Sequence, residues 1–215
     1  MEYELNINAV QELCERLIQE NNLKVKSFKV KYWKEEIVGE RLCCRSFFRK
    51  ILFYKSYKGQ ILIPKYFREE GSYERMAAYL LEHKSYDIYQ YAKDAGIEPE
   101  EALIMFFIFH EYGHLLLNAT DAVTYGTFKT SCEERDSREH IYKLNMIALI
   151  NAIRSNLTDE EVQEQMDQEM QKVRLAYRKL PSESFADNIG MKMLDKFKEN
   201  GQIKQLVKNI MVEVE

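Results

Sequence analysis

The sequence predicts an α+β protein, in which a small N-terminal antiparallel sheet packs on a mainly helical remainder. Apolar residues recur at helical spacing before about residue 22 and again after Gly71, whereas residues 23–64 are rich in aromatic and β-branched types typical of strands. An apolar content of 46% over 215 residues is enough for a sizeable core. No internal repeat, low-complexity tract or linker interrupts the chain, so we expect residues 1–215 to form a single domain.

The first elements are a helix and three strands. Asn6 is a good helix N-cap and precedes the amphipathic stretch "INAVQELCERLIQENN". Two strands are predicted in "KVKSFKVKYW" and "CCRSFFRKILFY". Lys58-Gly59 is the expected turn into a short strand, "QILIP", which ends at Pro64.

The rest of the chain is predicted to be helical. Gly96 and Gly201 end helices, and Pro99 is tolerated in the first turn of a long helix that reaches Asn118. A polar stretch from Ala119 to about Arg138 is expected to be irregular. The remaining predicted helices are "SYERMAAYLLEHK", "SYDIYQYAKDAG", "HIYKLNMIALINAI", "DEEVQEQMDQEMQKVRLAYRKL", and a final pair near 182–200 and 202–214.

Charge is distributed unevenly along the chain. Residues 24–68 hold thirteen Lys/Arg against three Glu, a net charge of +10, although the whole chain has a formal net charge of −4. Such a segment could bind an acidic partner or nucleic acid. Lysines that alternate along strands are also what the solvated face of a sheet carries. We favour the solvated face and leave nucleic acid open as a less favoured partner.

No membrane or secretion signal is apparent in the sequence. The longest unbroken apolar run, from Ala102 to Phe109, is far shorter than the roughly 20 residues that span a bilayer. The first residues, "MEYELNINAV", lack the basic start and apolar middle of a signal peptide. The four cysteines show no CxxC spacing and are expected to be reduced. We therefore expect a cytoplasmic protein without a membrane partner.

One short segment has the composition of a metal site: His110-Glu111-Tyr112-Gly113-His114. Residues four apart lie on the same face of a helix, so His110 and His114 can direct two imidazole nitrogens at one zinc ion. Glu111 lies about 100° round the helix, close enough to take a proton from a metal-bound water. Two histidines without a metal are the alternative, but burying them in this apolar helix would be costly. We therefore predict zinc as the cofactor and Glu111 as the catalytic base.

A zinc site of this kind needs a third protein ligand. The pattern HExxHxxGxxH is excluded, because Leu117 and Thr120 occupy the places of its glycine and third histidine. In "SESFADNIGMKML" Glu183 and Asp187 share a helix face, so Glu183 can bind zinc while Asp187 accepts a hydrogen bond from a ligand imidazole. Gly190 continues that face and would let the two helices pack closely.

These residues resemble the HExxH plus ExxxD pattern of the gluzincins, the glutamate-type zinc metallopeptidases. The glycine of HExGH and the run Glu183, Ala186, Asp187, Gly190, Leu194 are similar to compact bacterial members, including ImmA/IrrE-type and phage-exclusion peptidases. The resemblance covers roughly residues 50–195. It implies a zincin-like fold, zinc bound by His110, His114 and Glu183, Glu111 as base, and a β-hairpin, "FYKSYKGQILIP", before the motif helix.

The resemblance implies a zinc-dependent endopeptidase that cleaves a specific cytoplasmic protein, in phage or mobile-element regulation or defence. Its peptide substrate would add to a sheet edge, for which "QILIP" is suitable, although an ordinary core hairpin explains that strand equally well. An oxyanion donor is also required, and nothing in the sequence selects among four candidates by type: His140, Tyr125, Tyr142 and Tyr177. The alternative function is a zincin-fold binding protein with a non-proteolytic zinc site, whose basic N-terminal half docks a partner or nucleic acid.

Overall fold

The structure is a computed structural model that describes residues 3–32, 43–51, 54–67, 72–120, 132–154, 168 and 171–213. Internal contacts divide the chain into two compact units, residues 1–122 with 186–215 and residues 123–185. The boundary falls inside helix α8 (Pro181–Glu199), whose first turns belong to the second unit. The single domain expected over residues 1–215 therefore stays a prediction.

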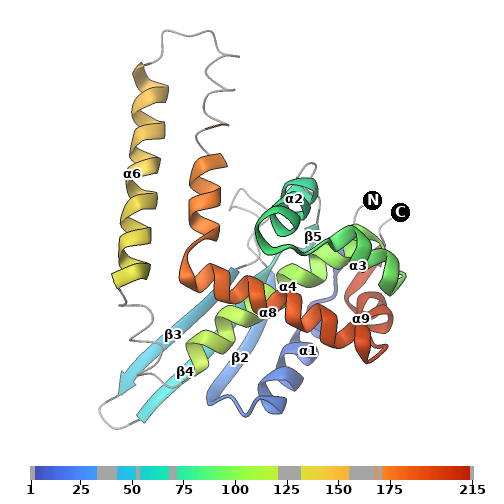
Figure 1. The fold of residues 1–215 in the computed structure, drawn as a ribbon. Coiled ribbons are helices and arrows are strands. Elements are labelled where there is room, and N and C mark those ends of the chain that lie inside the picture. The colour runs from blue at the N-terminus through green and yellow to red at the C-terminus, as the bar shows by residue number, and fades with distance from the viewer. Residues whose placement is uncertain are drawn as a thin grey trace. The chain divides into compact units, whose positions relative to one another are not determined.

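The first unit combines helices with two small sheets, so the α+β class is confirmed (Figure 1). Besides most of α8, its elements are β1 (Tyr3–Leu5), α1 (Ile7–Glu20), β2 (Val25–Tyr32), β3 (Cys43–Ile51), β4 (Tyr54–Ile63), β5 (Tyr66–Phe67), α2 (Ser72–Lys84), α3 (Ile88–Ala95), α4 (Pro99–Ala119), α9 (Ile203–Ile210) and β6 (Met211–Glu213). The second unit contains α6 (Cys132–Arg154) and a helix over 171–178. The predicted start of that last helix lies outside the described residues.

The larger sheet has the strand order β2-β4-β3 and is mixed rather than antiparallel. β3 and β4 form an antiparallel hairpin, in which Ile51 pairs with Tyr54. β2 pairs with β4 in parallel, for example Val30 with Ile61. The prediction of an antiparallel sheet is therefore wrong for β2. Residue alternation within a strand does not encode which neighbour it pairs with, and here the last strand inserts between the first two.

The predicted turn at Lys58-Gly59 is also wrong. Gly59 lies inside β4 and pairs with Phe28 on one side and Ser46 on the other. The last residue pair of the hairpin is instead Ile51 with Tyr54. Glycine weakens a strand but does not end it when both neighbouring strands are already in place.

The strand "QILIP" is part of the sheet interior. Ile61 and Ile63 are fully buried, and β4 has a neighbour along both sides. The core-hairpin interpretation is therefore confirmed, and this strand cannot take up a peptide at its edge. Among the strands that the structure describes, β2 and β3 lie at the edges of this sheet.

A second sheet, of order β5-β1-β6, joins the two ends of the described chain. Tyr3–Leu5 pairs antiparallel with Met211–Glu213, and Asn6 N–H donates to Ile210 O at 2.8 Å. The final helix, predicted near 202–214, ends at Ile210, and residues 211–213 form a strand instead. The prediction of a helix is therefore wrong for these three residues. Strands this short carry no readable alternation, and their pairing depends on residues about 200 positions apart in the chain.

Most predicted helix boundaries are present in the structure. Asn6 accepts hydrogen bonds from Asn8 N and Ala9 N, while Gly96 and Gly201 have φ values of 63° and 66° after their helices. Two boundaries differ. The N-cap of α3 is Asp87, the third residue of the predicted stretch "SYDIYQYAKDAG" rather than its first, and α6 begins within the stretch expected to be irregular.

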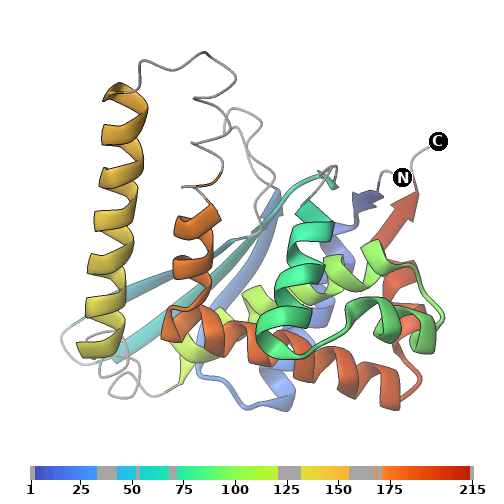
Figure 2. The same ribbon diagram turned by 45° about the horizontal axis from the view of Figure 1, so that its top comes forward.

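Helix α4 is the central element of the first unit. It contacts β3 and β4, and both views show it between that sheet and α8 (Figure 1 and Figure 2). On another face, Tyr112 OH donates to Leu17 O at 3.1 Å and accepts from Asn21 Nδ2 at 3.0 Å, which ties α4 to α1. By length and composition α4 could cross a membrane, but core helices meet the same test, and 72% of its apolar window is buried within the fold.

Candidate metal centre

Helices α4 and α8 approach each other closely at two glycines. A Cβ added to Gly113 would lie 2.8 Å from Ala186 Cα, and one added to Gly190 would lie 2.8 Å from Phe106 Cε2. Cβ atoms do not come so near to other heavy atoms, so these positions require glycine. The close approach predicted at Gly190 is present, and Gly113 of the motif gives a second contact of the same kind.

We expect Gly113→Ala to destabilise the protein. Alanine favours a helix interior by about 1 kcal/mol over glycine. Overpacking against the backbone of α8 costs about 1–3 kcal/mol, so a net loss should appear in urea unfolding. Asn118→Ala, which raises helix propensity in the last turn of α4, is the matched control and should not lose stability. A Gly113→Ala protein as stable as wild type would mean that the helices can separate without cost.

The two histidines of the motif direct the same nitrogen toward one point. His110 Nε2 lies 3.2 Å from His114 Nε2, and the ring planes are perpendicular. Two nitrogens at about 2.0–2.1 Å from a tetrahedral zinc ion are about 3.3–3.4 Å apart. The pair therefore has the spacing that one shared ion requires. His110 is almost fully buried and His114 is partly buried.

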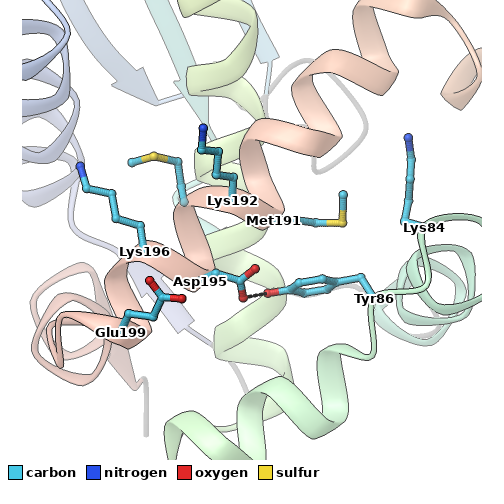
Figure 3. A pocket seen from close by; sticks show the side chains of 8 residues that line it. Lys84, Tyr86, Met191, Lys192, Asp195, Lys196 and Glu199 are labelled. Carbon is cyan, nitrogen blue, oxygen red and sulfur yellow. Dashed lines mark hydrogen bonds between the residues drawn. The ribbon is translucent and has the colours of Figure 1, made fainter.

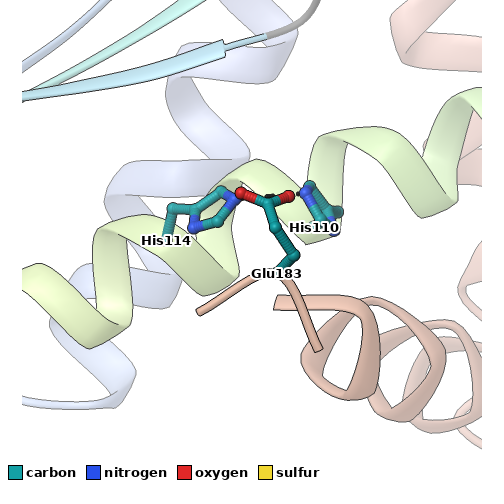
Figure 4. Close-up of side chains that lie close together, drawn as sticks. All are labelled: His110, His114 and Glu183. Atoms are coloured by element: carbon teal, nitrogen blue, oxygen red, sulfur yellow. Dashed lines mark hydrogen bonds between the residues drawn. The ribbon is translucent and has the colours of Figure 1, made fainter. Parts of the chain in front are cut away.

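Glu183 completes a group of three metal-binding side chains. It lies in the first turn of α8 and is 5% exposed. One ligand atom from each of His110, His114 and Glu183 lies within 4.8 Å of the others (Figure 4). Two imidazoles and one carboxylate are a donor set that zinc uses in catalytic sites.

Asp187 lies one turn further along α8 than Glu183 and contacts His110 on the Nδ1 side of its ring. Its Oδ1 lies 2.9 Å from His110 Nδ1, and its Oδ2 accepts a hydrogen bond from Tyr79 OH at 3.1 Å. Asp187 is fully buried. A carboxylate at Nδ1 fixes the tautomer in which Nε2 carries the lone pair, and such partners orient metal-binding histidines generally.

Glu111 follows His110 on α4 and is 6% exposed.

Two residues of the site were not predicted from the sequence. Tyr79 belongs to α2, where its spacing with Ala77 and Leu80 is that of an ordinary core residue. Glu134 of α6 is 1% exposed and holds the start of α8. No local pattern distinguishes either residue, because each acquires its role through a partner far away in the sequence.

The structure describes three of the four candidate oxyanion donors, all outside the group of His110, His114 and Glu183. His140 and Tyr142 lie exposed on α6, and Tyr177 is 46% exposed in the helix over 171–178. Tyr125 lies outside the described residues.

A separate hollow of about 580 Å³ lies along the C-terminal half of α8 (Figure 3). Two polar pairs lie along it: Tyr86 OH donates to Asp195 at 2.9 Å, and Lys196 Nζ donates to Glu20 at 3.2 Å. Burial and the adjacent Asp195 raise the pKa of Tyr86, so this phenol stays protonated and cannot serve as a base. The hollow contains none of the motif residues, and we assign no chemistry to it.

Comparison of the chain with protein-family models, curated proteins and solved structures gives no match. The geometry of His110, His114, Glu183 and Asp187 is therefore the structural basis for a function.

Proposed function

We propose that the chain is a zinc-dependent endopeptidase of the zincin type. The observation that carries the proposal is the convergence of two Nε2 atoms 3.2 Å apart, one of them on a histidine whose Nδ1 lies against a buried carboxylate. Two histidines with a purely structural role would not require a third metal-binding side chain nearby. Here Glu183 is such a side chain. The gluzincin resemblance has this same ligand set.

The residues present fit zinc, and His110, His114 and Glu183 would hold it. Bound zinc would supply a water of lowered pKa and would polarise the substrate carbonyl. Glu111 would accept the proton of that water and then deliver it to the leaving amine. Asp187 would keep the His110 lone pair directed at the metal throughout.

A protein substrate would bind as an extended strand at a sheet edge. β4 is excluded because both of its sides are paired. Of the two strands β2 and β3, β3 has the more extensive contact with α4 in the first unit. We therefore place the substrate strand along β3. A cytoplasmic target in phage or mobile-element regulation or defence is the setting that the resemblance suggests.

Metal content tests the proposal directly. Protein purified without chelators is expected to contain about one zinc per chain by elemental analysis, because the donor set is complete. His110→Ala and His114→Ala should each lose it. His83→Ala, which removes a histidine of α2 outside the group, is the control and should keep it. Wild-type protein without zinc, or zinc retained in both motif variants, would refute the site.

The binding alternative has one structural observation in its favour. Across the larger sheet, Lys29 of β2 and Arg45 of β3 both pair with Gln60 of β4, so the register brings two basic residues into one row. Salt-sensitive nucleic-acid binding without cleavage of any protein would favour this alternative over the peptidase.

A further inference from the structure

A buried carboxylate on α6 holds the first turn of α8. Glu134 is 1% exposed, although glutamate is rarely buried without a partner. Its Oε2 accepts a hydrogen bond from Ser182 N at 3.2 Å, and its Oε1 accepts one from Ser182 Oγ at 2.9 Å. Both oxygens of one side chain therefore engage one residue 48 positions later in the chain.

This contact gives a hydrogen-bond acceptor to the first turn of α8. The first N–H groups of a helix have no partner within the helix, and their partial positive charge favours an anion. Pro181 has no N–H, so Ser182 carries the first such donor of α8. Glu134 caps it from another helix. Its charge is offset by Arg138 Nη2 at 2.6 Å, one turn further along α6.

We infer that Glu134 is a positioning residue for Glu183, an inference that rests on the proposed metal site. We call the two hydrogen bonds from Ser182 to Glu134 the clamp. Glu183 directly follows Ser182, so the clamp sets the backbone from which the third ligand extends. His110 and His114 are placed by α4, independently of this contact. The clamp thus makes zinc affinity depend on α6, which contributes no ligand itself.

Glu134→Gln is expected to weaken zinc binding by about 10–100-fold, the usual range for residues that orient a ligand. Glutamine keeps the shape but loses the charge and one acceptor. Ser182→Ala, which removes only the hydroxyl donor, should have a smaller effect in the same direction. Glu139→Gln is the matched control: it breaks the same i,i+4 type of ion pair, to Lys143 at 2.8 Å, on the exposed side of α6. It should leave the zinc dissociation constant within about twofold of wild type.

A double-mutant cycle separates positioning from general destabilisation. In a Glu183→Gln background the third carboxylate is already gone, so Glu134→Gln should weaken zinc binding no further. An equal loss in both backgrounds would mean that Glu134 acts through overall stability, and the inference would be wrong.

Hydrogen exchange in the metal-free protein tests the clamp without zinc. Amides of residues 182–186 should exchange faster in Glu134→Gln than in wild type, with no change in Glu139→Gln. If wild-type protein bound no zinc, the proposed function would fail while this measurement still tested the clamp. Unchanged exchange in Glu134→Gln would overturn the inference, as would an unchanged zinc affinity in a wild type that binds zinc.

Discussion

Glu111→Gln is expected to reduce peptide-bond hydrolysis by roughly 10²–10⁴-fold while leaving zinc bound, because a positioned general base contributes a factor of that size. Glutamine has nearly the shape of glutamate but cannot take up a proton at neutral pH. Glu111 is outside the group formed by His110, His114 and Glu183, so the metal should stay. A purely structural zinc site would be indifferent to this change.

The measurement compares new protein N-termini in cells that express wild type or Glu111→Gln, which detects cleavage of any protein substrate. Cleavage products that depend on the enzyme should disappear in the variant, and zinc content should be equal. Glu100→Gln lies eleven residues earlier on α4, about 16 Å away along the axis, and serves as the control. Full cleavage by Glu111→Gln would eliminate the general-base mechanism. Loss of zinc in that variant would instead make Glu111 part of the metal site.

The core of this candidate site was predictable because its geometry is local. His110 and His114 are four apart on one helix, and Glu183 and Asp187 are four apart on another, so each pair has a fixed internal arrangement before any tertiary contact forms. The local spacing leaves only one thing open, which is whether the two helices pack against each other. Gly190 indicated it, since a glycine within a helix usually has a packing reason.

The features that escaped prediction are those that depend on distant pairing. The middle position of β4 and the joining of β1 to β6 are decided by which strands meet, and alternation within one strand does not carry that information. Tyr79 and Glu134 belong to the same class. Tyr79 OH reaches Asp187, 108 residues further on, and local spacing makes this tyrosine an ordinary core residue.

The chain of contacts from Tyr79 through Asp187 to His110 leads to the second large effect. Asp187→Ala is expected to weaken zinc binding by about 10–100-fold, because His110 loses the acceptor that fixes its tautomer. It should also lower the free energy of unfolding of the metal-free protein by about 1–3 kcal/mol, since the buried hydroxyl of Tyr79 loses its acceptor. Chelator competition measures the first quantity and urea unfolding the second.

A pair of tyrosine variants distinguishes orientation of the ligand from simple loss of stability. Tyr79→Phe and Tyr86→Phe each delete one tyrosine-to-aspartate hydrogen bond, to Asp187 and to Asp195 respectively. Each should cost a similar free energy of unfolding, about 0.5–1.5 kcal/mol. Only Tyr79→Phe should also weaken zinc binding, because only Asp187 continues to a metal-binding histidine. A wild-type zinc affinity in both variants would mean that Asp187 holds His110 without help from Tyr79. The same loss of zinc affinity in both variants would mean that stability alone controls the site.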